Sequence, residues 1–261
     1  MRGNAVDHSN SSAEVNPKAA PPVNANKNGD AGHGNPLGRR ITMSNVLVAL
    51  PHGLTLYQKR IVMLAVGKLN SRDQIGFTDQ VVSAREYADL CSIDLRTAYK
   101  EITEAAQTLA RSAVRTRNPH TGKPVDIPWL KKAEYNSGSV ALRFNDQMAD
   151  GLLQLKTLFT SYRLANVARL RSAHAWRLYE LLVRYRKSGR ARYAAGELAD
   201  ALGLTVPQRA NFAEARRSVI EPATRSVSKA TDIQITDIAT ERAGRRIVAV
   251  TFQFHAAHPF G

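Results

Sequence analysis

Side chains able to recognise base edges are concentrated in one stretch of the chain: Gln208, Arg209, Asn211, Arg216 and Arg217. Arginine can donate two hydrogen bonds to O6 and N7 of guanine, and asparagine or glutamine can pair similarly with adenine. Residues near the start of a recognition helix enter the major groove first. We therefore expect Arg209 and Asn211 to read bases, with Gln208 beside them.

Arg216 and Arg217 lie further along the same predicted helix, where they suit contact with either a base or a phosphate. Glu214 and Glu221 lie close to them in the sequence. The alternative interpretation is that these arginines form ion pairs on the helix surface and contact nothing else.

A second group of basic residues flanks this helix. Three arginines, Arg242, Arg245 and Arg246, fall in the turn of a predicted β-hairpin, where they suit phosphates or the minor groove, unless they are simply solvated. Arg190 and Arg192 precede the predicted helix-turn-helix and are expected to reach the DNA backbone.

The first half of the chain has weaker equivalents of both groups. Arg96, Thr97 and Lys100 begin its own recognition helix, although this half is less basic and dimerisation is an equal alternative role. Three lysines in its hairpin region could contact phosphates or be solvated: Lys123, Lys131 and Lys132.

These residues are positioned by an order of elements that occurs twice. Hydrophobic periodicity and capping boxes predict helices in the first copy at about 55–70, 84–90 and 95–111, then strands at 112–117, 126–135 and 139–144. The second copy has helices at about 173–187, 195–202 and from 208, then a hairpin over 232–254. Helix, helix-turn-helix and hairpin is the order of a winged-helix domain. The fold class is therefore α+β, with two tandem winged-helix domains as a pseudo-repeat.

The boundaries follow from composition and pattern. Residues 1–38 are rich in small and polar residues and are predicted to be a disordered tail. We expect the first domain over 39–145, connecting helices over 146–171, and the second domain, the main DNA reader, over 172–255.

The helical patterns also predict which side chains are buried. Tyr57 is placed on the inner face of the first helix and Lys59 and Arg60 away from it, while Leu95 and Tyr99 are placed on the inner face of the recognition helix. Pro222 is expected to bend or break the last helix. Three further residues are expected in the core: Cys91, Trp129 and Trp176.

Charge favours a polyanionic partner. The chain of 261 residues has a formal net charge of +15, and residues 140–261 alone carry 19 basic and 10 acidic side chains. A generally basic proteome is the alternative explanation. The single cysteine excludes an internal disulfide, and the lack of a long apolar run predicts a cytoplasmic protein that does not contact membranes.

Catalytic patterns are absent from the sequence. The segment Thr121-Gly122-Lys123-Pro124 lacks the first glycine and the Ser/Thr of a phosphate-binding loop, and the histidines form no H-x-H motif. We expect no enzymatic activity, cofactor or metal. A rolling-circle relaxase would need a tyrosine near a histidine pair, which this sequence lacks.

Several segments together resemble the iteron-binding replication initiators (Rep proteins) of theta-replicating bacterial plasmids. They are LTLYQKRIVML at 54–64, KLNS at 68–71, AYKE at 98–101, FTSY at 159–162 and LYELL at 178–182. The resemblance covers about 43–254. It implies two winged-helix domains whose monomers bind directly repeated iterons and help to open an AT-rich region. It also implies recruitment of the host initiator protein, replicative helicase and chaperones.

The same resemblance implies dimers, paired through the first domain, that bind an operator inverted repeat and repress the protein's own gene. A winged-helix transcriptional regulator without an origin function is the main alternative. Tandem direct repeats next to an AT-rich segment would distinguish the initiator from the regulator.

Overall fold

The structure is a computed structural model that describes residues 35–51, 53–69, 78–118, 121–152 and 158–257. The predicted tail therefore lies outside the described residues up to position 34. Residues 35–38, which were also assigned to the tail, are ordered. They form the 3-10 helix η1 (Pro36–Gly38), in which the Asn35 side chain accepts a hydrogen bond from Leu37 N and Pro36 is buried.

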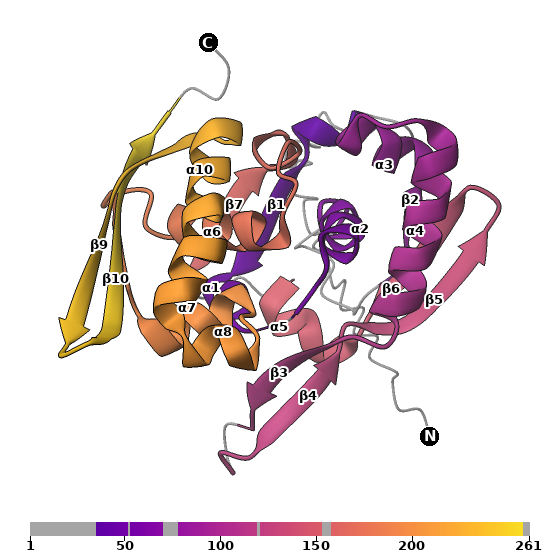
Figure 1. The fold of residues 1–261 in the computed structure, drawn as a ribbon. Coiled ribbons are helices and arrows are strands. Elements are labelled where there is room, and N and C mark those ends of the chain that lie inside the picture. Colours follow the sequence, from indigo (N-terminus) through magenta and orange to yellow (C-terminus); the bar gives the residue numbers. More distant parts are fainter. Residues whose placement is uncertain (1–34, 52, 70–77, 119–120, 153–157, 258–261) are drawn as a thin grey trace, which may run out of the picture. The chain divides into compact units, whose positions relative to one another are not determined.

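The first winged-helix domain has the predicted order of elements (Figure 1). Its helices are α2 (Leu56–Val66), α3 (Ala84–Cys91) and α4 (Leu95–Leu109), and its sheet strands are β2 (Gln80–Ser83), β5 (Leu130–Asn136) and β6 (Ser139–Phe144). The strand order is β2-β6-β5, so the strand before the helix-turn-helix pairs with the last strand of the hairpin. The predicted capping boxes Thr55–Gln58 and Ser83–Glu86 are both present.

The strand predicted over 126–135 is divided in two. Its first part belongs to strand β4 (Pro124–Pro128), which pairs with β3 (Ala113–Arg117) in a separate two-stranded hairpin. Its second part belongs to β5, which begins only after Trp129. Trp129 is buried, and its backbone N donates to Ser112 O. A buried side chain at this point explains the break, because the chain enters the core between the exposed β3–β4 hairpin and the strand pair β5–β6.

The region predicted as connecting helices, 146–171, contains a strand instead of a continuous helix. Short helices are found at η2 (Asp146–Met148), α5 (Ala149–Leu152) and η3 (Leu164–Asn166), but β7 (Phe159–Arg163) is extended. It pairs antiparallel with β1 (Arg40–Ser44), which leads into α1 (Asn45–Ala49). The helical prediction was wrong there because the strand's partner lies more than 100 residues away.

The second winged-helix domain repeats the topology of the first. It begins with α6 (Ala173–Val183), β8 (Arg190–Ala194) and α7 (Ala195–Leu202), and ends with the hairpin of β9 (Ile233–Ala243) and β10 (Arg246–Ala256). The strand order β8-β10-β9 matches β2-β6-β5 position by position. This equivalence bears out the pseudo-repeat more strongly than sequence identity between the halves does.

The long helix predicted from 208 consists of four consecutive segments. They are α8 (Val206–Ala210), α9 (Phe212–Ala215), a π-helical turn (Arg216–Ile220, η4) and α10 (Glu221–Ala230). Asn211, with φ −118° and ψ 74°, separates the first two. The π-helical turn ends at Ile220, two residues before Pro222, whose missing N–H cannot continue the regular ladder. The helix is therefore irregular just before Pro222, but it is not broken at Pro222 itself, which lies in the first turn of α10.

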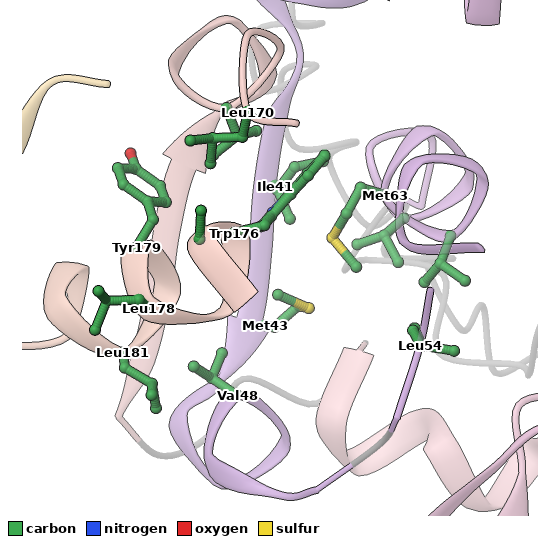
Figure 2. Packing of buried hydrophobic residues seen from close by; sticks show 14 of the residues in the cluster. Ile41, Met43, Val48, Leu54, Met63, Leu170, Trp176, Leu178, Tyr179 and Leu181 are labelled. Carbon is green, nitrogen blue, oxygen red and sulfur yellow. The ribbon is translucent and has the colours of Figure 1, made fainter. Parts of the chain in front are cut away.

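From Gln58 to Val66 helix α2 is buried on all sides, contrary to the prediction for Lys59 and Arg60. Both are buried, whereas Tyr57 is half exposed. One apolar cluster surrounds the helix and extends from the first domain into the second. Figure 2 shows part of it, with side chains from β1, α2 and α6. Trp129, Trp176 and Cys91 lie in this core, as predicted.

Lys59 is neutralised by a carboxylate from the second domain. Its Nζ lies 2.7 Å from Oε2 of Glu180 on α6, and both side chains are almost inaccessible to solvent (2% and 0% exposed). Tyr162 donates to the other oxygen of Glu180 at 2.7 Å, and NH1 of Arg177 lies 3.4 Å from Oε2. We call Lys59, Tyr162, Arg177 and Glu180 the buried charge cluster.

Candidate nucleic-acid interface

The first helix-turn-helix is held by a left-handed residue and a cap. Ser92 ends α3 with φ 53° and ψ 53°, and Ile93 N donates to Ala88 O at 3.2 Å. Asp94 then caps α4 by accepting from the Thr97 backbone and hydroxyl at 2.9 and 2.6 Å. The capping bonds lower the pKa of the Asp94 carboxyl. Thr97 is therefore engaged in the cap, and its predicted contact with DNA remains a prediction.

The outer face of α4 carries two exposed cations. Arg96 and Lys100 are exposed, and within the described part of the chain neither side chain has an ion pair or hydrogen bond. Leu95 and Tyr99, predicted on the inner face, are about half exposed beside them. The face offered to solvent thus combines two free cations with an aliphatic and an aromatic side chain.

The second helix-turn-helix has the same construction. Gly203 ends α7 with φ 71° and ψ 36°, and Leu204 N donates to Ala199 O at 2.9 Å. Thr205 caps α8, and its backbone N donates to Oε1 of Gln208 at 2.9 Å. The Gln208 amide oxygen is therefore bound within the cap, which leaves its amide nitrogen to meet a base.

Arg209 folds back over this turn. Its Nε donates to Leu204 O at 2.7 Å, its NH2 lies 3.5 Å from Ala199 O, and its NH1 pairs with Asp200. The guanidinium therefore bonds the carbonyls at the end of α7 and stabilises the turn. Its proposed reading of guanine remains untested, and it requires these bonds to be exchanged for bonds to the base.

The other predicted residues of the recognition helix also have protein partners. Oδ1 of Asn211 accepts from Glu214 N at 3.2 Å and caps α9. Arg217 pairs with Glu214, and Nε of Arg216 lies 3.2 Å from Glu221. The ion pairs that the alternative interpretation expects are thus present for both arginines, and their contact with DNA remains a prediction. Exposed pairs contribute little stability, so a phosphate can replace the carboxylate at small cost.

The hairpin of the second domain carries a mixture of paired and free arginines. Arg192 on β8 makes a bidentate contact with Glu241 on β9, with both distances 2.7 Å, which lowers the pKa of the Glu241 carboxyl. Arg242 donates to the backbone of Arg245 at 3.1 Å and shapes the turn.

Three arginines here are exposed, and within the described residues their side chains form no hydrogen bond or ion pair: Arg190, Arg245 and Arg246. Arg190 begins β8, while the other two lie at the tip of the β9–β10 hairpin next to Gly244, whose φ is +59°. The hairpin tip is therefore a positively charged loop, as the sequence predicts, and it matches the wing of a winged helix in position.

The lysines predicted for the first hairpin are separated by the division of the 126–135 strand. Lys123 precedes β4, whereas Lys131 pairs with Asp146 at 2.7 Å and Lys132 pairs with Glu134 at 2.6 Å on β5. They do not share one surface element. Arg115 and Arg117 on β3 are two further exposed cations that the sequence reasoning does not predict as DNA contacts. Their alternation along an exposed strand is the signal that could have identified them.

Comparison with known proteins agrees with this architecture. Residues 40–183 match the family model described as "Initiator Replication protein, WH1", and residues 196–254 match "Initiator Rep protein, WH2". The first match includes α6, which by topology is the first helix of the second winged helix. The chain belongs to the initiator replication protein family. An uncharacterised 27.6 kDa protein of Escherichia coli is 27% identical to this family member over 208 residues, which are 74% of this chain and 87% of that protein.

A solved relative has the same fold. The crystal structure of the Pi initiator protein in complex with iteron DNA superimposes with a TM-score of 0.69 and 21% identity, covering 85% of this chain and 99% of that one. The family models confirm the resemblance to Rep initiators, and this superposition agrees with the fold of two tandem winged helices. No helix among the described residues combines the length and the apolar character required to cross a bilayer.

Proposed function

We propose that this chain initiates plasmid replication by binding repeated duplex sites in the origin through both winged helices. The observation that carries the proposal is the repetition of one helix-turn-helix geometry in a member of the initiator family. Each copy presents its recognition helix to solvent and has exposed cations on or beside it. Arg96 and Lys100 serve the first copy, and Arg190 and the hairpin arginines serve the second.

Both recognition helices are expected to enter the major groove, with the second domain as the main reader. The cations without acidic partners suit phosphate contacts, which position the protein, while side chains of the recognition helices supply sequence discrimination. The carboxylates paired with Arg216 and Arg217 hold these side chains until phosphates replace them.

DNase footprinting on the DNA flanking the protein's own gene tests this function. We expect protection of direct repeats at a regular spacing of roughly two helical turns if both domains engage. Permanganate reactivity in an adjacent AT-rich segment is expected only in the presence of the protein. Protection of a single promoter palindrome would instead favour a transcriptional regulator and would contradict the origin function.

We further propose that dimers formed through the first domain repress the protein's own gene at an inverted repeat. Support comes from family membership and from the exposed β3–β4 hairpin of that domain (Figure 1). Sedimentation with and without DNA measures this equilibrium, and monomer alone at micromolar concentration would contradict it. Recruitment of the host initiator, helicase and chaperones belongs to the same proposal and is tested by pull-down with the purified host proteins.

We also propose that the chain acts by differential binding and catalyses no bond cleavage. The support is that the side chains at the proposed interface are arginines, lysines and amides, several of them paired with carboxylates, and these groups suit binding of a polyanion. Incubation of supercoiled origin DNA with the protein and Mg²⁺ should leave it unnicked. Formation of nicked circles that depends on a tyrosine of this chain would favour the relaxase alternative.

A further inference from the structure

The two helix-turn-helix motifs agree in a detail that the proposed function does not use. In both, the left-handed residue is followed by an aliphatic residue that packs on the core, Ile93 or Leu204, and then by the capping residue. The next residue in each motif is again aliphatic but points outward. Leu95 is 52% exposed and Val206 is 79% exposed.

Single exposed aliphatic residues are ordinary on protein surfaces. Here, however, the same exposed type occurs at the first position of both recognition helices, where the backbone geometry of the two turns coincides. Neither residue is part of the buried core. Local folding gives no reason for an aliphatic side chain at this position, because the caps are made by the residues before it. This recurrence points to a ligand.

The surroundings of Val206 indicate the chemistry of that ligand. Pro207 and Ala210 on α8 and Ala213 on α9 are also exposed, while Arg209 is folded back over the turn. The leading surface of this recognition helix is therefore apolar and offers few hydrogen-bond donors. In the major groove the group that distinguishes a base by apolar contact is the C5-methyl of thymine.

We propose that Val206 contacts a thymine C5-methyl in the major groove and that Leu95 does the same for the first domain. The inference rests on the proposed DNA-binding function. Charge favours DNA over a protein partner, because Leu95 lies beside Arg96 and Lys100, which have no acidic partner in the described residues. An apolar protein surface would leave these two cations unpaired on burial, whereas DNA supplies phosphates.

Replacing single thymines by uracil tests the inference, because uracil pairs identically and lacks only the methyl group. The duplex is first enriched from a random library by the full wild-type chain, and each thymine is then replaced in turn. Loss of one buried methyl-sized group corresponds to about fourfold weaker binding (~0.8 kcal/mol). We expect this loss at one thymine or a few, and no effect at the others.

Variants then assign each methyl to a side chain. Val206→Ser should bind the thymine duplex about fourfold less tightly and should no longer distinguish thymine from uracil at its own position. Leu95→Ser should remove the sensitivity at a different thymine. Both side chains are exposed, so the variants should fold normally. The matched control is Val46→Ser on α1, a valine that is 66% exposed and distant in sequence from both motifs, which should keep the wild-type uracil profile.

The outcomes distinguish failure of the thymine-methyl contact from failure of the proposed DNA-binding function. Failure to enrich any sequence would contradict sequence-specific binding and would remove the inference with it. Enrichment of a sequence whose thymines are all replaceable by uracil would overturn the inference and leave the function standing. Uracil sensitivity that persists in both serine variants would likewise overturn it. So would a change in sedimentation of Val206→Ser without any uracil effect, which would indicate a protein contact instead.

Discussion

Replacing Glu180 by glutamine should destabilise the fold strongly, because it removes the only anion of the buried charge cluster. Glu180 lies 2.7 Å from the Lys59 ammonium and 3.4 Å from the Arg177 guanidinium, and it accepts a hydrogen bond from Tyr162 at 2.7 Å. Glutamine keeps the shape of the side chain but leaves two buried cations without a counter-charge. Breaking a buried pair in this way costs about 3–5 kcal/mol.

A second substitution tests whether the loss of stability in Glu180→Gln is caused by charge and not by packing. In Lys59→Met/Glu180→Gln one buried cation is removed together with the anion. The remaining Arg177 still donates to Ala201 O at 2.9 Å and to Leu50 O at 3.0 Å. The double variant should therefore be more stable than Glu180→Gln alone, with a coupling energy of roughly 1–3 kcal/mol.

Urea unfolding followed by circular dichroism measures these differences as shifts in midpoint at constant m value. The control is Asp126→Asn, which breaks the exposed pair with Arg115, whose side chains are 51% and 72% exposed. That change should cost no more than about 1 kcal/mol. If Glu180→Gln cost no more than this control, or if adding Lys59→Met lowered stability further, the electrostatic account of the cluster would be wrong.

Three further predictions concern pH, salt and backbone conformation. Burial lowers the pKa of Lys59 to about 8. Between pH 8 and 10 this lysine therefore binds more protons in the unfolded chain than in the folded one. The free energy of unfolding should then rise by roughly 2 kcal/mol over this range. Lys59→Met should flatten this rise; at higher pH the buried tyrosines, whose pKa values are raised, reverse it. Replacing both Arg245 and Arg246 by alanine should reduce the slope of the logarithm of the DNA-binding constant against the logarithm of salt concentration by about 1.8. Fluorescence anisotropy measures this slope, and an unchanged slope would exclude phosphate contacts at the hairpin tip. Gly189→Ala should cost more than about 1 kcal/mol in thermal unfolding, because φ is +64° and the new Cβ would lie 2.7 Å from Phe254 O; an unchanged melting temperature would contradict that geometry.

The parts of the fold that were predicted correctly depend on neighbours in the sequence. The capping boxes at Thr55 and Ser83 and the regular inner face of α4 at Ala98, Ile102 and Leu109 are short-range signals, and all are present. The errors depend on distant partners. Strand β7 is extended because β1 pairs with it. Lys59 is buried because it pairs with Glu180, which lies 121 residues away in sequence. Periodicity cannot detect such pairs.

The candidate site shows the same division. The ion pair of Arg217 with Glu214 follows from helical spacing, and the sequence alone offered it as an alternative. The orientation of Arg209 does not follow from helical spacing, because its contacts with Asp200 and with the Leu204 carbonyl determine it. Side-chain type thus predicted which residues can bind DNA, while tertiary contacts decide which of them are free to do so.

The buried charge cluster also bears on how the two reading helices act together. Lys59 belongs to the helix that packs against α4, whereas Glu180 belongs to the helix that packs against α10, so the cluster lies between the supports of both recognition helices. Arg177 adds a bond to the end of α7, next to the second turn. A charged pair in an apolar core contributes little net stability compared with apolar residues of similar size, but it is costly to separate. Any rearrangement of one domain against the other must therefore either keep this contact or expose its charges to water together. The two recognition helices are in this way coupled through their supporting helices, and a change that loosens the cluster should weaken binding to a site that needs both domains more than binding to a site that needs one.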